Sequence, residues 1–180
     1  MVPTTSFADC PEPLDVLLVP GGFGSNDAIQ DQEILAFLKK RGATAKFITS
    51  VCSGSLILGA AGLLDGYRAA AHWAVYKALE AMNIEGIHER VVVDRNRITG
   101  GGVTAELDFG LSLLARLRGE DVARVSQLLM EYDPQPPFKS GHPRKADAHA
   151  VAAAIALMQD FPERAVALAK ARLTTKSAAA

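Results

Sequence analysis

Short apolar runs alternate with amphipathic segments along the first two thirds of the chain. Leu14–Val19 and Phe47–Val51 are almost continuously apolar and end in turn residues, as strands buried in a parallel sheet do. Between them, Asp27–Arg41 repeats apolar residues at helical spacing, with a predicted inner side formed by Ile34, Leu35, Phe37 and Leu38. Strands that alternate with helices predict an α/β fold built on a parallel sheet.

This alternation continues as far as Glu131, after which the composition changes. The expected elements are a helix over Leu56–Ala61, a short strand over Tyr67–Ala71, a helix over Ala74–Met82, a hairpin of Glu89–Asp94 with Arg97–Thr99, and helices over Ala105–Leu117 and Glu120–Glu131. Residues 132–138 are rich in proline and residues 139–145 are polar. We expect one α/β domain over residues 1–138. Residues 139–180 are expected to form a linker and an alanine-rich helical extension, Ala146–Met158, packed on the same domain or on a partner.

The overall composition excludes several classes of protein. The chain has 180 residues, 49% of them hydrophobic, and a net charge of −1, so electrostatics gives no case for binding nucleic acid or an anionic membrane. No segment approaches the roughly 20 consecutive apolar residues of a membrane span. Cys10 and Cys52 lie in dissimilar settings and no signal peptide precedes them, so we expect free thiols in a reducing cytoplasm.

Cys52 is the strongest candidate for chemistry. It lies where the apolar strand Phe47–Val51 breaks into the small-residue run Ser53–Ser55 and then into an apolar helix. In a strand–turn–helix of this kind the nucleophile sits on a strained turn, and its side chain projects above the edge of the sheet. The start of the helix favours negative charge, so we expect a lowered pKa for the Cys52 thiol. The alternative is a small buried cysteine that only packs.

Other patterns in the chain carry weaker chemical signals. Gly21–Gly24 lacks the full spacing of a dinucleotide fingerprint, and Gly100–Gly102 lacks the lysine of a phosphate loop, so we expect tight turns beside Cys52. The four histidines have no spacing typical of a metal site, so no metal is expected. His72 is either a general base for Cys52 or, as we favour, an imidazole that is hydrogen-bonded near a strand end.

The motifs along residues 20–138 resemble the PfpI/ThiJ-like superfamily and, within it, the isocyanide hydratases. The matching pieces are Pro20–Gly22, Val51–Leu56, Gly59–Gly66, His72–Trp73, Thr99–Asp108 and Glu131–Phe138. Only the last piece is specific to the hydratases, since the others also occur in sensor domains of AraC-type regulators. The resemblance implies a flavodoxin-like three-layer sandwich around a mostly parallel sheet, with the active site at the nucleophile elbow. It also implies a homodimer that acts on a small molecule without a cofactor.

For the hydratases, the resemblance implies a mechanism as well. The Cys52 thiolate attacks the terminal carbon of an isocyanide, and water resolves the thioimidate to an N-substituted formamide. Cys52 and Ser53 are then the catalytic residues, with the Ser53 hydroxyl holding an acid or the water. The implied pocket around them, including an oxyanion-hole-like cradle of backbone N–H groups, consists of Gly21, Gly22, Gly54 and His72. Trp73 and Phe138 either wall this pocket or merely pack.

One part of the superfamily pattern has no counterpart in this sequence. In the proteins that the chain resembles, a strand–helix–strand precedes the stretch corresponding to Val2–Pro11, and it carries the central strand and the acidic partner of the cysteine. Resemblance therefore names no catalytic acid here. The sequence does not decide whether Met1 is the true start. A chain without that segment is expected to be inactive, and to aggregate or form a larger assembly through Leu14–Val19. The nearby carboxylates are expected to be ordinary solvated groups, namely Asp9, Glu12 and Asp15.

Two other functions stand beside a cysteine-dependent hydratase. One is a non-catalytic sensor or binding domain of the AraC-regulator type, which keeps the elbow but is followed by a helix-turn-helix region. The residues after Phe138 show no turn pattern between two helices, which favours the enzyme. The other is a stress-related protein whose Cys52 responds to oxidants through its thiolate.

Overall fold

The structure is a computed structural model that describes residues 3–178. Its central sheet has the strand order β1-β2-β6-β5. The strands β1 (Val16–Val19), β2 (Phe47–Ser50) and β6 (Arg97–Gly100) run parallel, and β5 (Val91–Asp94) is antiparallel to β6. Two short strands, β3 (Arg68–Ala69) and β4 (Glu85–Gly86), pair in parallel as a second sheet. The register aligns Val19 with Ser50 and Ser50 with Thr99, so the carboxyl ends of β1, β2 and β6 meet at one edge.

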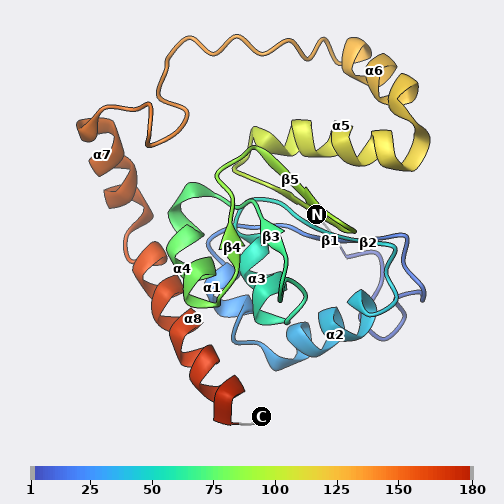
Figure 1. Ribbon diagram of the computed structural model, residues 1–180, viewed down its shortest axis with the longest axis vertical. Helices are drawn as coiled ribbons and strands as arrows, with labels where there is room; N and C mark the ends of the chain where they lie inside the picture. The colour runs from blue at the N-terminus through green and yellow to red at the C-terminus, as the bar shows by residue number, and fades with distance from the viewer. Residues whose placement is uncertain (1–2, 179–180) are drawn as a thin grey trace.

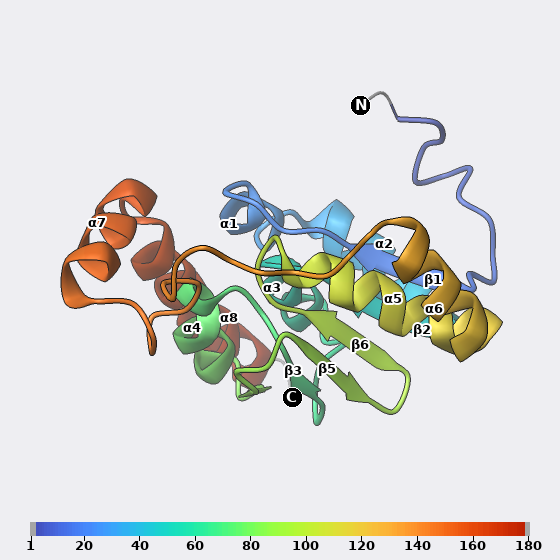
Figure 2. The ribbon, with the colours of Figure 1, turned by 90° about the horizontal axis from the view of Figure 1, so that it is seen from above.

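Helices cover both faces of this sheet (Figure 1). One layer consists of α5 (Ala105–Arg118) and α6 (Glu120–Leu129). The opposite layer consists of α1 (Ser25–Ala28), α2 (Gln32–Gly42), α3 (Gly54–Ala60), the 3-10 turn η1 (Trp73–Val75), α4 (Tyr76–Ala81) and α8 (Phe161–Ala178). In Figure 2, α7 (Ala148–Met158) lies beside α8, at the end of the long segment that follows α6. The predicted three-layer α/β fold with a mostly parallel sheet is confirmed.

Each face of the sheet has its own apolar cluster. Leu17 of β1, Ile48 of β2 and Leu56 of α3 belong to the main core, on the α3 side. A smaller cluster on the other side joins Ile98 of β6 to Phe109 of α5. Burial on both faces explains why the strands are apolar almost throughout instead of alternating. The two clusters hold the end of β2 between the layers, and the candidate nucleophile follows directly.

Two of the expected helices begin differently in the structure. The helix expected over Asp27–Arg41 is divided into α1 and α2. The division arises because the Asp31 carboxylate accepts hydrogen bonds from the N–H groups of Glu33 (2.9 Å) and Ile34 (3.1 Å) and so caps a new helix. The helix expected over Ala74–Met82 begins as the turn η1, which the Nδ1 of the preceding His72 caps. Strand β4 gives no pattern in the sequence, since only two of its residues pair.

The C-terminal part forms two helices. The expected alanine-rich helix is α7, and none of its residues is buried. Contact with the domain is made by α8, in which Phe161, Ala165 and Ala169 are buried in the main core. Gln159 separates the two helices with a φ angle of 53°, which ends α7 and turns the chain back toward α4.

Candidate active site

Cys52 lies just after β2 on a strained turn of the backbone. Its φ angle is 57°, in the left-handed region that residues other than glycine rarely adopt. Its N–H donates to the carbonyl oxygens of Gly101 (2.7 Å) and Gly100 (3.2 Å), at the end of β6. The side chain is partly exposed at the carboxyl edge of the sheet. The structure therefore has the strand–turn–helix geometry expected of a nucleophile elbow.

Two glycines allow the elbow to approach the end of β1. A Cβ atom on Gly54 would lie 2.1 Å from the carbonyl oxygen of Val19, so a larger residue at the start of α3 requires the backbone to move. A Cβ atom on Gly21 would lie 2.3 Å from the backbone nitrogen of Ser53. The structure thus brings Gly21 and Gly54 against the turn that carries Cys52.

The Ser53 side chain links this turn to the loop after β1. Its Oγ accepts a hydrogen bond from the N–H of Gly22 (2.9 Å), and it lies within hydrogen-bonding distance of the Gly22 carbonyl oxygen (3.2 Å) and of Ser25 Oγ (2.8 Å). Because the Gly22 N–H is engaged by Ser53, it is not free to hold an anion, which corrects the expected cradle at this position. The N–H and the hydroxyl of Ser53 also influence the ionisation of the Cys52 thiol.

Burial raises the pKa of the Cys52 thiol above its ordinary value. The N–H and the hydroxyl of Ser53 lower this pKa, and the negative charge of Glu106 adds to the increase. The expected lowering is therefore wrong, because desolvation of the sulfur outweighs the donors at the start of α3. The resting site holds a neutral thiol, which needs a base before it can act as a nucleophile.

Glu106 is the group in this site that the sequence reasoning missed. It lies in the first turn of α5, and its partly buried carboxylate is the one whose charge acts on the Cys52 sulfur. Within residues 3–178, none of the ion pairs involves Glu106. A signal was present in the sequence, since Glu106 closely follows the run Gly100–Gly102 that was expected to lie beside Cys52.

His72 contacts the elbow through its backbone. Its backbone N–H donates to the Cys52 carbonyl oxygen (3.1 Å), and its Nδ1 accepts the N–H of Ala74 (3.3 Å). A Cβ atom on Gly102 would lie 3.1 Å from the His72 ring. Burial lowers the pKa of this imidazole, which keeps it neutral and preserves Nδ1 as an acceptor. This geometry agrees with the favoured interpretation of a hydrogen-bonded imidazole near a strand end.

The remaining candidates contribute less to the site. Trp73 lies with its ring 5.3 Å from that of His72, whereas Phe138 is 77% exposed. Cys52 lines neither the cavity of about 820 Å³ nor the cavity of about 320 Å³ found elsewhere in the fold. Across residues 3–178, the His, Cys, Asp and Glu side chains form no group of three suited to a metal ion. In the same part of the chain, no helix combines the length and apolar character that crossing a membrane requires.

A family model and three known proteins are similar to this chain. The model, described as the DJ-1/PfpI family, matches residues 1–116. The isonitrile hydratase of Pseudomonas putida is 46% identical over 172 residues, which cover 92% of this chain and 75% of that enzyme. The HTH-type transcriptional regulator GbdR of Pseudomonas aeruginosa is 34% identical over 120 residues, which cover 65% of this chain and 32% of the regulator.

The third known protein is a solved structure. The crystal structure of a ThiJ/PfpI family protein from Pseudomonas syringae is 55% identical and has a TM-score of 0.90, covering 94% of this chain and 70% of that one. The flavodoxin-like fold and the superfamily implied by the sequence motifs are thereby confirmed.

Proposed function

This chain belongs to the DJ-1/PfpI family, and we propose that it hydrates isocyanides to N-substituted formamides through Cys52. The observation that carries the proposal is the similarity to isonitrile hydratase along nearly the whole chain. The strained turn at Cys52 supports the choice of nucleophile. The same proposal includes a small-molecule substrate, no cofactor, a cytoplasmic location and a homodimer.

In the first half-reaction, the Cys52 thiol adds to the terminal carbon of an isocyanide, R–N≡C. Because burial raises the pKa of the thiol, a base must remove its proton, and we assign this role to Glu106, whose negative charge raises the same pKa. The sulfur then bonds to the terminal carbon, and Glu106 returns the proton to the same carbon. The product is a thioimidate, R–N=CH–S–Cys52, and no oxidant or reductant is consumed.

In the second half-reaction, water resolves the thioimidate. Glu106 accepts a proton from water as the water oxygen bonds to the carbon, and it passes this proton to the nitrogen. Cleavage of the C–S bond leaves the formamide, R–NH–CHO, and the remaining hydroxyl proton passes to the Cys52 sulfur as the carbonyl forms. The N–H and hydroxyl of Ser53 stabilise the departing sulfur, since both lower the pKa of the Cys52 thiol.

A sensor or binding domain is the second candidate, and the similarity to GbdR favours it. Such a domain would keep the turn at Cys52 and bind a small molecule without converting it. An oxidant-responsive thiol is the weaker alternative. Oxidants react with the thiolate, and the raised pKa of Cys52 reduces the thiolate fraction near neutral pH.

The test is to incubate the protein with cyclohexyl isocyanide and with an aryl isocyanide, and to measure the formamides by chromatography. In a form of the protein that also carries the strand–helix–strand of the hydratases ahead of Val2–Pro11, we expect both products to appear, to be lost in Cys52→Ala and to be unaffected in Cys10→Ala. A folded protein that binds the isocyanides, converts neither and keeps the same affinity in Cys52→Ala would contradict the hydratase and support the sensor.

A further inference from the structure

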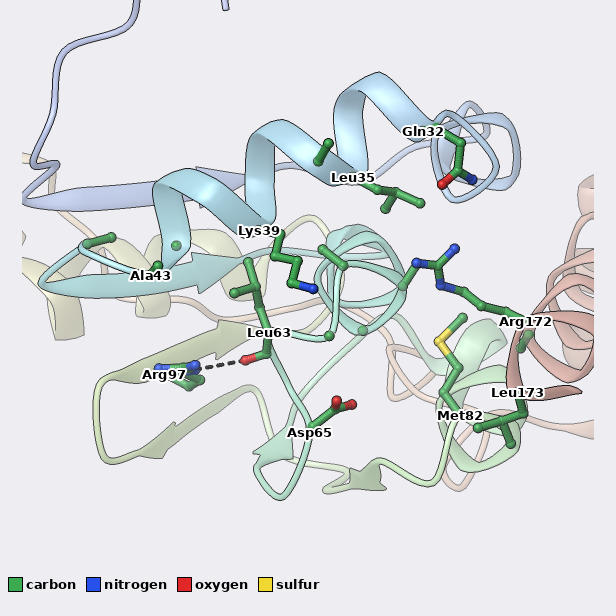
Figure 3. A pocket seen from close by; sticks show the side chains of 18 of the residues that line it. Gln32, Leu35, Lys39, Ala43, Leu63, Asp65, Met82, Arg97, Arg172 and Leu173 are labelled. Carbon is green, nitrogen blue, oxygen red and sulfur yellow. Dashed lines mark hydrogen bonds between the residues drawn. The ribbon is translucent and has the colours of Figure 1, made fainter. Parts of the chain in front are cut away.

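A cavity of about 820 Å³ lies between α2 and α8, beside the C-terminal end of α3 (Figure 3). Cys52 precedes the N-terminal end of the same helix, so the cavity and the candidate active site are at opposite ends of α3. None of the residues assigned to the hydration reaction lines it. Its volume falls within the range of about 300–1,000 Å³ that is usual for small-molecule sites.

Small residues keep this space open. Gly59, Ala60 and Ala61 line it from the end of α3, and Ala36 lines it from α2. A Cβ atom on Gly59 would meet the Ile84 side chain at 2.6 Å, so the end of α3 packs tightly against Ile84. Larger apolar side chains complete the wall, namely Leu35, Leu63, Met82 and Leu173. The cavity therefore offers an apolar surface to a ligand.

The charged residues around the cavity are mostly basic. Lys39 of α2, Arg97 of β6 and Arg172 of α8 line it, and among the described lining residues one carboxylate, that of Asp65, opposes them. Figure 3 shows Lys39 and Arg172 extending from opposite walls into the space between α2 and α8. Among the ion pairs of the described residues, none involves Lys39. This arrangement is complementary to a negatively charged group.

Arg97 is fixed at the cavity wall. Its Nε donates to the Leu63 carbonyl oxygen (2.9 Å), and its guanidinium lies 4.0 Å from the centre of the Tyr67 ring. Burial lowers the pKa of Arg97, which marks a cation that has lost part of its hydration. A fixed, partly desolvated guanidinium attracts an anion more strongly than a mobile surface cation does. Water screens its charge less, and its side chain loses less freedom when the anion binds.

We propose that this cavity binds a small organic anion, a carboxylate or phosphate carried on an apolar body. The anionic group lies between Lys39 and Arg172, and the apolar body lies against Leu35, Leu63 and Met82. Binding there is separate from the hydration of isocyanides, because the two sites share no residue.

The test measures binding of octanoate, octyl phosphate and octanamide by isothermal titration calorimetry. Both anions are expected to bind, and the uncharged amide at least about tenfold more weakly, because charge-assisted contacts are lost.

Lys39→Ala and Arg172→Ala are each expected to weaken anion binding by about three- to tenfold. The matched controls Lys40→Ala and Lys170→Ala remove the same kind of charge from the same helices outside the cavity, and should leave the affinity unchanged. Ala36→Trp, at an exposed position of α2 that lines the cavity, should abolish binding while the protein stays folded.

Binding of one anion alone would support the proposal and identify the carboxylate or the phosphate as the recognised group. No binding of either anion, equal binding of octanamide, or the same loss in Lys40→Ala as in Lys39→Ala would overturn it. Unchanged binding in a folded Ala36→Trp protein would also overturn it, since the anion would then lie elsewhere.

Discussion

The backbone N–H of Gly22 donates a hydrogen bond of 2.9 Å to Oγ of Ser53, which joins the loop after β1 to the turn that carries Cys52. Ser53 itself is 2% exposed, and its hydroxyl also lowers the pKa of the Cys52 thiol. One buried hydroxyl therefore holds two segments of the candidate site together and influences the ionisation of the nucleophile.

Ser53→Ala should weaken both of these effects. Loss of the hydrogen bond to Gly22 is expected to reduce the free energy of unfolding by about 1 kcal/mol. The pKa of Cys52 should rise further, because one of the donors that lowers it is removed. Denaturant unfolding and the pH dependence of Cys52 alkylation measure the two changes. The control is Ser140→Ala, at an exposed serine, and an equal effect of both substitutions would contradict the account.

Gly54→Ala tests the close approach of α3 to β1. A Cβ atom at this position would lie 2.1 Å from the Val19 carbonyl oxygen, so the elbow must shift. We expect a loss of about 1–3 kcal/mol in the free energy of unfolding, as for other overpacked sites, together with loss of activity. Gly110→Ala is the matched control, since Gly110 lies in α5 with open space beside it. Alanine there should be neutral or stabilising by about 0.5–1 kcal/mol. A fully stable and active Gly54→Ala protein would contradict this geometry.

The elbow could be predicted from the sequence because its signal is local: an apolar strand, a cysteine and then small residues. The pKa of Cys52 could not, because it depends on burial by segments that are distant in sequence. The approach of Glu106 likewise depends on the pairing of β2 with β6, which sets where α5 begins relative to Cys52. The break between α1 and α2 has a local cause, the Asp31 cap, but the apolar periodicity of Asp27–Arg41 conceals it.

His72 should make the protein less stable in acid. Burial lowers the pKa of His72 in the folded protein. Its contribution to the free energy of unfolding is therefore present above the pKa of an unfolded histidine, about 6.5, and is lost as the pH falls through the folded pKa. His72→Asn keeps an acceptor for the Ala74 N–H but cannot titrate, so its stability should fall less between pH 7 and pH 5. Thermal unfolding at several pH values measures this, with His149→Asn on the exposed face of α7 as the control. Identical pH slopes for His72→Asn and the unmodified protein would refute the prediction.

Glu106→Gln separates an electrostatic effect from a catalytic one. Removing the negative charge should lower the pKa of Cys52, so alkylation near neutral pH should become faster. Formamide production should nevertheless fall by about 10²–10⁴-fold, because the proton carrier is lost. Asp121→Asn, at an exposed carboxylate of α6, should change neither rate. Faster alkylation with undiminished turnover would show that Glu106 influences the thiol but carries no proton.

The most direct test of the central claim is mass spectrometry of the protein after acid quenching during turnover of an isocyanide. If Cys52 is the nucleophile, the peptide that contains it should gain the mass of one intact isocyanide, because the thiol adds to the carbon without losing an atom. The adduct should be absent in Cys52→Ala and should disappear as the substrate is exhausted. Formamide production by Cys52→Ala, or an adduct confined to Cys10 during turnover, would contradict the account.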